Sequence, residues 1–262
     1  MFVINVPYFN LDQIYNSLQA PRWIKVRELK YIVIYKEHVL KVEQQKERLI
    51  FSCSEEEFYN IWFNYFDLKT DCLIENNKIK RLGGKFKIPA NRGNGIHILN
   101  QDPFEMYVFS KLVYYVGYTE ATKLMNWIAC DYGIEHKQSM REVGRVTWYE
   151  WPTPERFLEQ LNEEEITGKV KIFLKKLCNA IVNEDLDITK SDNELFKLLG
   201  MHEVNSFPLD GIKDALEKNF GENPEDFADW YLDEIENKGL VYMYILHHIS
   251  NPPKEKFIYG VN

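Results

Sequence analysis

The chain has 262 residues, of which 45% are hydrophobic and 15% aromatic, so it is long enough for one large or two ordinary domains and is not a disordered protein. Its 40 acidic and 32 basic residues give a net charge of −8, which argues against a protein that relies on general attraction to phosphates. No apolar run approaches about 20 residues and no signal-peptide pattern is present, so we expect a cytoplasmic protein without a membrane partner.

The cysteine and histidine positions predict no metal site and no cofactor. The four cysteines are separated by 19, 58 and 48 residues, which excludes the close pairs of zinc and iron–sulfur sites, so buried or incidental thiols are expected at Cys53, Cys72, Cys130 and Cys178. The adjacent His247 and His248 point about 100° apart on a helix and do not readily face one ion.

The first 60 residues carry strand patterns. β-branched and aromatic runs at 31–35, 39–42 and 49–52 are separated by short polar turns, which predicts antiparallel strands of one sheet. Ser54 followed three residues later by Glu57 has the form of a capping box before an aromatic helix over 58–66. The glycines and proline of 83–84 and 89–95 predict a loop.

From Asp102 the pattern changes to helices. Asp102 and Pro103 predict an N-cap and first residue of a helix that reaches about Gly117. Further helices are expected over 119–132, from 154, and over 162–165, 168–182, 191–199, 211–220 and 224–249. These elements predict an α+β protein, with an antiparallel sheet domain over residues 1–97 and an all-helical domain over residues 98–262.

Seven short motifs occur in the order found in one family of DNA repair enzymes. They include Gln19-Ala-Pro-Arg22-Trp23, Tyr65 to Asp71, Ile98 to Glu105, Trp151 to Glu155 and Phe207-Pro-Leu-Asp210. Over nearly its whole length the chain resembles the 8-oxoguanine DNA glycosylase family. The resemblance implies an antiparallel N-terminal domain, a helical glycosylase domain with a helix-hairpin-helix, and duplex DNA with a damaged or modified base as the partner.

Two recognition devices of that family differ here. The family reads the damaged base with a glycine carbonyl just before the motif glutamine, and Leu18 occupies this place before Gln19. Asparagines that fill the opened duplex are replaced by Tyr114 and Tyr115. With Arg22, these residues are the candidates for contact with a base or with DNA on this side of the site.

The helix-hairpin-helix is expected to be incomplete. A helix runs into Gly200 and His202, the candidate DNA-contacting residues of the shortened turn, and the chain then passes directly to Phe207 and Asp210. The segment that carries the family's lysine nucleophile is missing in this alignment. A competing alignment makes Lys190 the nucleophile, because it lies 20 residues before Asp210.

Asp210 has two interpretations. Its carboxylate either stabilises positive charge that develops on the sugar, or caps the helix that begins near Gly211. The favoured hypothesis is a catalytically degenerate relative that is retained for binding DNA or protein. The alternatives are an active monofunctional glycosylase that uses Asp210 on another base, and a protein-interaction scaffold that does not bind nucleic acid.

Overall fold

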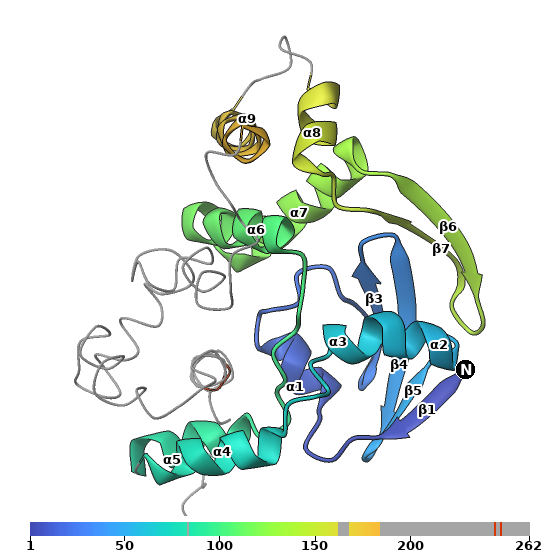
Figure 1. Cartoon of the computed structure of the whole chain (residues 1–262), viewed down its shortest axis with the longest axis vertical. Coiled ribbons are helices and arrows are strands. Elements are labelled where there is room, and N and C mark those ends of the chain that lie inside the picture. Colours follow the sequence, from blue (N-terminus) through green and yellow to red (C-terminus); the bar gives the residue numbers. More distant parts are fainter. Residues whose placement is uncertain (83, 162–167, 184–243, 245–246, 248–262) are drawn as a thin grey trace, which may run out of the picture.

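The protein is described by a computed structural model that covers residues 1–82, 84–161, 168–183, 244 and 247 (Figure 1). These residues form a five-stranded sheet with helices packed on one face and a long β-hairpin on the other. A larger helical part lies beside the sheet (Figure 1). Within these residues, no helix is long and apolar enough to cross a membrane.

The sheet is antiparallel with the strand order β1-β5-β4-β3-β2. Its strands are β1 (Phe2–Asn5), β2 (Ile24–Arg27), β3 (Lys30–Tyr35), β4 (His38–Gln45) and β5 (Arg48–Phe51). Tyr35 pairs with His38 and Gln45 with Arg48, so two-residue turns join β3 to β4 and β4 to β5. The three predicted strands are confirmed, and β1 and β2 add an edge strand on each side.

An aromatic helical segment covers the inner face of the sheet. It consists of α2 (Glu55–Glu57), the π-helical turn η1 (Phe58–Trp62) and α3 (Phe63–Tyr65), beside the short helix α1 (Leu11–Asn16). The predicted cap is confirmed, because Ser54 Oγ accepts a hydrogen bond from the Glu57 amide at 3.1 Å. The fully buried rings of Phe58, Trp62 and Phe66 belong to the hydrophobic core between this segment and the sheet.

A pair of helices follows where the sequence predicted a loop. Helix α4 (Cys72–Arg81) begins at the N-cap Asp71, and α5 (Gly84–Arg92) contains Pro89 in its interior. The loop prediction is therefore wrong for Gly84 and for 89–92, whereas Gly83 lies outside the described residues. Phe86 and Ala90 are buried one helical turn apart in the core, and this burial outweighs the backbone hydrogen bond that proline removes.

The remaining predicted helices within the described residues are confirmed. They are α6 (Pro103–Val116), α7 (Tyr118–Tyr132), α8 (Pro154–Gln160) and α9 (Lys169–Val182). Asp102 Oδ1 accepts from the Glu105 amide at 2.9 Å, so the predicted cap sets the start of α6. The predicted helices over 162–165, 191–199, 211–220 and 224–249 lie outside the described residues, apart from Tyr244 and His247.

These helices share a second core that also includes residues before position 98. Ile79 of α4 and Phe86 of α5 lie in it with residues of α6, α7, α8 and α9, and the fully buried Tyr244 joins them. The division of the chain at residues 97 and 98 stays a prediction.

A β-hairpin interrupts the helices, so the prediction of an all-helical second part is wrong. Strands β6 (Glu135–Met140) and β7 (Gly144–Tyr149) pair in register and reach across to the sheet (Figure 1). The sequence of β6 is mostly polar and lacks β-branched residues, which hides the strand from pattern analysis. The hairpin is held instead by burial of its inner face against distant residues.

The hairpin covers the outer face of the sheet. Met140, Val146 and Trp148 form a separate buried cluster with three sheet residues, Ile32, Ile34 and Val39. At the hairpin tip the Glu142 carboxylate lies 2.7 Å from Lys30 Nζ and 3.4 Å from Lys41 Nζ. Hydrogen bonds from Lys30 and then Lys41 lower the pKa of Glu142 to about 2. The hairpin thus joins the sheet to the helical part.

We expect Glu142→Gln to lower the urea midpoint of unfolding at pH 7. Because the pKa of Glu142 is depressed in the folded state, its stabilising effect is present above about pH 4.5 and is lost as the pH falls toward 2. The difference between variant and wild type should therefore shrink over this range in urea titrations. Glu159→Gln, at an exposed position of α8, should leave the midpoint nearly unchanged. A difference that stays constant down to pH 2.5 would contradict this account of the hairpin tip.

Candidate functional site

The backbone is strained at Leu18, just after helix α1. Ser17 is the C-cap of the helix, and Leu18 has a φ of 67°, in the left-handed region that favours glycine. The side chain of Leu18 is half-buried. The predicted reader position therefore combines a glycine-like backbone with a branched side chain.

Gln19 holds this segment in place. Its buried side-chain amide donates to Ser17 Oγ and to the His97 carbonyl, both at 2.9 Å, and accepts from the Leu99 amide at 2.8 Å. These bonds tie the residues on either side of Leu18 to the 97–99 segment, which lies about 80 positions further along the chain. The left-handed turn is thus fixed by contacts outside itself.

Arg22 is buried, and its side chain contacts α6 and the hairpin. Its guanidinium contacts the Glu105 carboxylate at 3.3 Å and donates to the Tyr149 carbonyl. The side chains of Arg22 and Glu105 are 4% and 9% exposed. Burial raises the pKa of Glu105, and the adjacent Arg22 charge opposes this shift. In this structure Arg22 joins its own segment to α6 and β7, and its contact with DNA stays a prediction.

His97 is a buried histidine that the motif analysis did not identify. Its Nδ1 lies 3.3 Å from the Asp67 carbonyl oxygen, and its ring packs on Phe9 with the ring centres 4.7 Å apart. Burial lowers the pKa of His97 to about 4, so the imidazole is neutral at pH 7. His97 and Glu105 both lie in or beside the 98–105 motif, and that position was the signal available from the sequence.

The other predicted site residues are only partly described. Tyr115 is 68% exposed in the last turn of α6, the place predicted to face opened DNA, while the side chain of Tyr114 is outside the description. Lys190, Gly200, His202 and Asp210 all lie outside the described residues. Whether any lysine approaches Asp210 therefore stays open.

Within the described residues no metal site is found, and three of the cysteines are buried thiols with raised pKa values. No three His, Cys, Asp or Glu side chains within it lie close enough to hold a metal ion. Burial raises the pKa of Cys53 to about 11 and the pKa of Cys72 and Cys178 to about 12, as expected for structural thiols. Cys130 is the exposed cysteine of the four.

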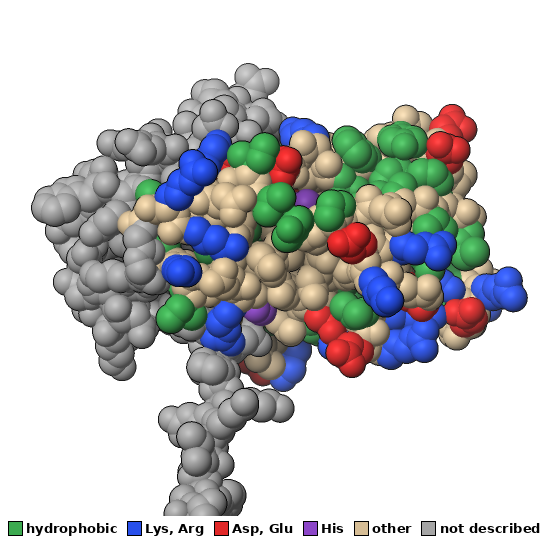
Figure 2. Space-filling view, turned by 90° about the horizontal axis from the view of Figure 1, so that it is seen from below, with side chains coloured by type: hydrophobic (Ala, Val, Ile, Leu, Met, Phe, Trp, Pro, Cys, Tyr) green, Lys and Arg blue, Asp and Glu red, His purple; other side chains and the backbone are tan. Residues whose placement is uncertain are grey.

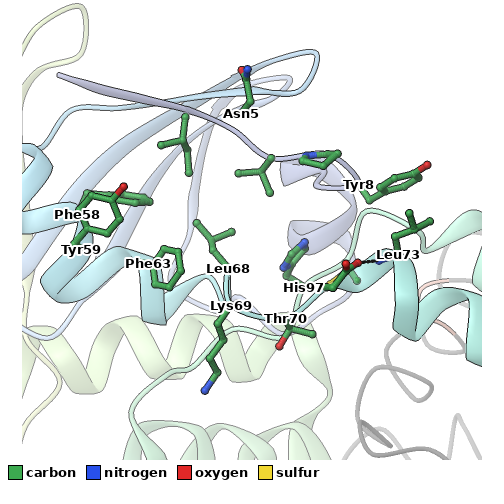
Figure 3. Close-up of a pocket in the computed structure, with 15 residues that line it drawn as sticks. Asn5, Tyr8, Phe58, Tyr59, Phe63, Leu68, Lys69, Thr70, Leu73 and His97 are labelled. Atoms are coloured by element: carbon green, nitrogen blue, oxygen red, sulfur yellow. Dashed lines mark hydrogen bonds between the residues drawn. The ribbon is translucent and has the colours of Figure 1, made fainter.

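An open groove of about 480 Å³ lies at the β1 side of the sheet (Figure 3). Phe58, Tyr59 and Phe63 line one end, and Tyr8 and His97 lie toward the other (Figure 3). None of the predicted site residues lines this groove, but His97, whose carbonyl accepts a hydrogen bond from Gln19, does.

Residues 1–107 match the family described as 8-oxoguanine DNA glycosylase, N-terminal domain, and this part of the chain belongs to that family. The resemblance inferred from the motifs is therefore confirmed. No curated protein matches the sequence.

Solved structures share this fold in matches that cover 94–95% of the chain. A structure of MBOgg1 in complex with a low-affinity DNA ligand is 20% identical, covers 94% of each chain and has a TM-score of 0.76. The apo-form of the 8-oxoguanine glycosylase/lyase of Clostridium acetobutylicum is 23% identical, covers 94% of this chain and 95% of its own, and has a TM-score of 0.75. The 3-methyladenine DNA-glycosylase of Archaeoglobus fulgidus is 14% identical, covers 95% of this chain and 98% of its own, and has a TM-score of 0.64. The α+β fold class is confirmed.

Proposed function

We propose that this protein is a divergent, 8-oxoguanine glycosylase-like protein that binds duplex DNA with a damaged or modified base and does not excise 8-oxoguanine. Support for a DNA partner comes from the fold, since two similar structures carry DNA: MBOgg1 with its ligand, and the Clostridium acetobutylicum enzyme with 8-oxoguanine opposite cytosine. Under this proposal the protein has kept the binding of duplex DNA and has lost the excision of 8-oxoguanine.

The observation that carries the proposal is the Leu18 turn. In the family, a glycine at this place lets the backbone meet the purine edge, whereas here a side chain occupies a left-handed backbone position. A non-glycine residue in that conformation costs about 1–2 kcal/mol, and the Gln19 hydrogen bonds hold the turn despite this cost. A branched side chain beside the carbonyl should crowd a purine that meets the backbone.

The chemistry argument comes from the sequence between residues 187 and 210. The favoured alignment leaves no lysine in this segment, and the sequence pattern then predicts that Asp210 caps a helix beginning near Gly211. Without an amine nucleophile, the covalent step of a glycosylase/lyase is not available. If Lys190 is the nucleophile instead, the experiment below should give excision and a borohydride-trapped adduct.

A second candidate is an active monofunctional glycosylase with a different base. The anchored Leu18 turn favours it. A turn that keeps its glycine-like backbone still presents a carbonyl as the family's glycine does, while the leucine side chain changes the shape of the pocket. In this case Asp210 stabilises positive charge on the sugar and water is the nucleophile.

The test combines binding and excision on the same duplexes. We expect the wild-type protein to retain duplex DNA in a salt-sensitive manner, to release no 8-oxoguanine, and to form no borohydride-trapped adduct. Asp210→Asn and Lys190→Gln should then leave binding unchanged.

Excision of 8-oxoguanine with a trapped adduct that Lys190→Gln abolishes would overturn the proposal. An abasic product from another base in a panel of damaged and modified bases, lost in Asp210→Asn, would establish the second candidate instead. Failure to retain any duplex at low salt would leave the protein-interaction scaffold as the remaining hypothesis.

A further inference from the structure

The α4–α5 helix pair concentrates positive charge in a protein that is acidic overall. Residues 72–92 contain six basic residues and one acidic residue, which gives +5, whereas the remaining 26 basic and 39 acidic residues give −13. Five of the six basic residues fall within 78–87, a stretch with no acidic residue. Toward the grey region in Figure 2, Lys and Arg side chains predominate, whereas basic and acidic side chains are mixed at the opposite end.

Helix geometry brings these charges to one end of the pair. Helix α4 ends at Arg81 and α5 begins at Gly84, and the two helices pack side by side, so the last turn of one meets the first turn of the other (Figure 1). We call this end the basic tip. It consists of Lys78, Lys80 and Arg81 from α4 and Lys87 from α5.

Helix electrostatics explains the part of the basic tip that belongs to α4. Cations in the last turn of α4 are stabilised by the negative end of its helix dipole. Lys87, however, lies in the first turn of α5, where the positive end of the dipole disfavours a cation and where no acidic residue is present. Its position therefore works against helix stability and calls for another explanation.

Most of the charge at the basic tip is not neutralised by neighbours. The acidic residue of this pair, Glu75, is buried and lies 2.7 Å from Lys78. Among the residues that the structure describes, Lys80, Arg81 and Lys87 have no ion-pair partner, and Arg81 and Lys87 are exposed. Three cations are thus available to an anionic ligand.

From this charge arrangement we propose that the basic tip is a second contact surface for duplex DNA, which holds the phosphate backbone outside the predicted base-reading segment. The inference rests on the proposed DNA-binding function. A compact group of lysine and arginine side chains on adjoining helix ends matches the closely spaced charges of a duplex without reading its sequence. The surface would raise affinity equally for damaged and undamaged DNA.

The test measures how the dissociation constant for a duplex depends on salt. In the variant K80Q/R81Q/K87Q, we expect the slope of log Kd against log salt to fall by about 2 to 3, since each lost phosphate contact removes about 0.9, and Kd at low salt to rise about tenfold or more. The matched control is K36Q/K46Q/R48Q, which removes the same number of exposed charges from the sheet turns and the start of β5 and should keep the wild-type slope. Circular dichroism and urea unfolding verify that both variants are folded.

Lysine acetylation read by mass spectrometry gives an independent measurement on the wild-type protein. Duplex DNA should protect Lys80 and Lys87 and leave Lys46 reactive.

Equal slopes for the two triple variants, with wild-type binding intact, would overturn the inference and leave the proposed function standing. A wild-type protein that retains no duplex would overturn both. Tight binding to vesicles of anionic lipid that the charge variant abolishes, with no change in DNA binding, would assign the basic tip to a membrane and overturn the inference.

Discussion

Replacing Arg22 with methionine should lower the free energy of unfolding by about 3–5 kcal/mol, the largest effect that we expect of a single substitution. The change leaves the Glu105 carboxylate buried without its cationic partner and removes the hydrogen bond to the Tyr149 carbonyl. The measurement is urea unfolding at pH 5 and pH 8.

The pH dependence identifies the orphaned carboxylate as the cause. Burial already raises the pKa of Glu105 in the folded state, and loss of Arg22 removes the charge that opposes this shift. A raised carboxyl pKa means that stability is lost as the pH rises above the ordinary value of 4.5, so the defect of Arg22→Met should be larger at pH 8 than at pH 5.

Two further variants complete the design. The double variant R22M/E105L, which removes both charges, should recover most of the lost stability. Arg27→Met removes an arginine whose ion pair with Glu43, at 3.1 Å, is exposed, and should cost less than about 1 kcal/mol. Equal losses for Arg22→Met and Arg27→Met would show that the buried position of Arg22 is unimportant.

The free energy of unfolding should fall by roughly 3 kcal/mol as the pH drops from about 6.5 to about 4, because His97 resists protonation in the folded state. The pKa of His97 is about 4 against an ordinary value of 6.5, so the unfolded chain binds a proton in this range and the folded chain does not. The stabilising difference is present above pH 6.5 and is lost progressively as the pH falls toward 4.

The variant His97→Asn isolates this effect. Asparagine offers an amide donor near the place of Nδ1, which faces the Asp67 carbonyl, but it does not titrate. We expect His97→Asn to be less stable than the wild type at pH 7 and to show a flatter decline of unfolding free energy between pH 6.5 and 4.5. Parallel declines for both proteins would show that His97 is not the titrating group.

Local signals predicted those parts of the fold that local chemistry fixes. The caps at Ser54, Asp102 and Thr153 mark the starts of three helical segments because each side chain bonds a backbone amide three residues away. Helix α5 and the β6–β7 hairpin escaped prediction, because burial against distant residues outweighs an internal proline in one and a polar strand sequence in the other.

The candidate site shows the same division. The motifs identified Gln19 and Arg22, but their partners lie 78, 83 and 127 positions away at His97, Glu105 and Tyr149. No spacing rule connects such residues, so the interior positions of these two side chains emerged only from the fold. The left-handed backbone of Leu18 was equally hidden, because leucine seldom adopts it.

The covered outer face of the sheet has a consequence for biosynthesis. The strands that carry Ile32, Ile34 and Val39 leave the ribosome long before the hairpin that supplies Trp148. Until that hairpin is translated, one side of the newly made sheet is an uncovered apolar strip. Chaperones bind surfaces of this kind, and such surfaces drive self-association of nascent chains. The order of synthesis thus makes the N-terminal part dependent on a segment made much later.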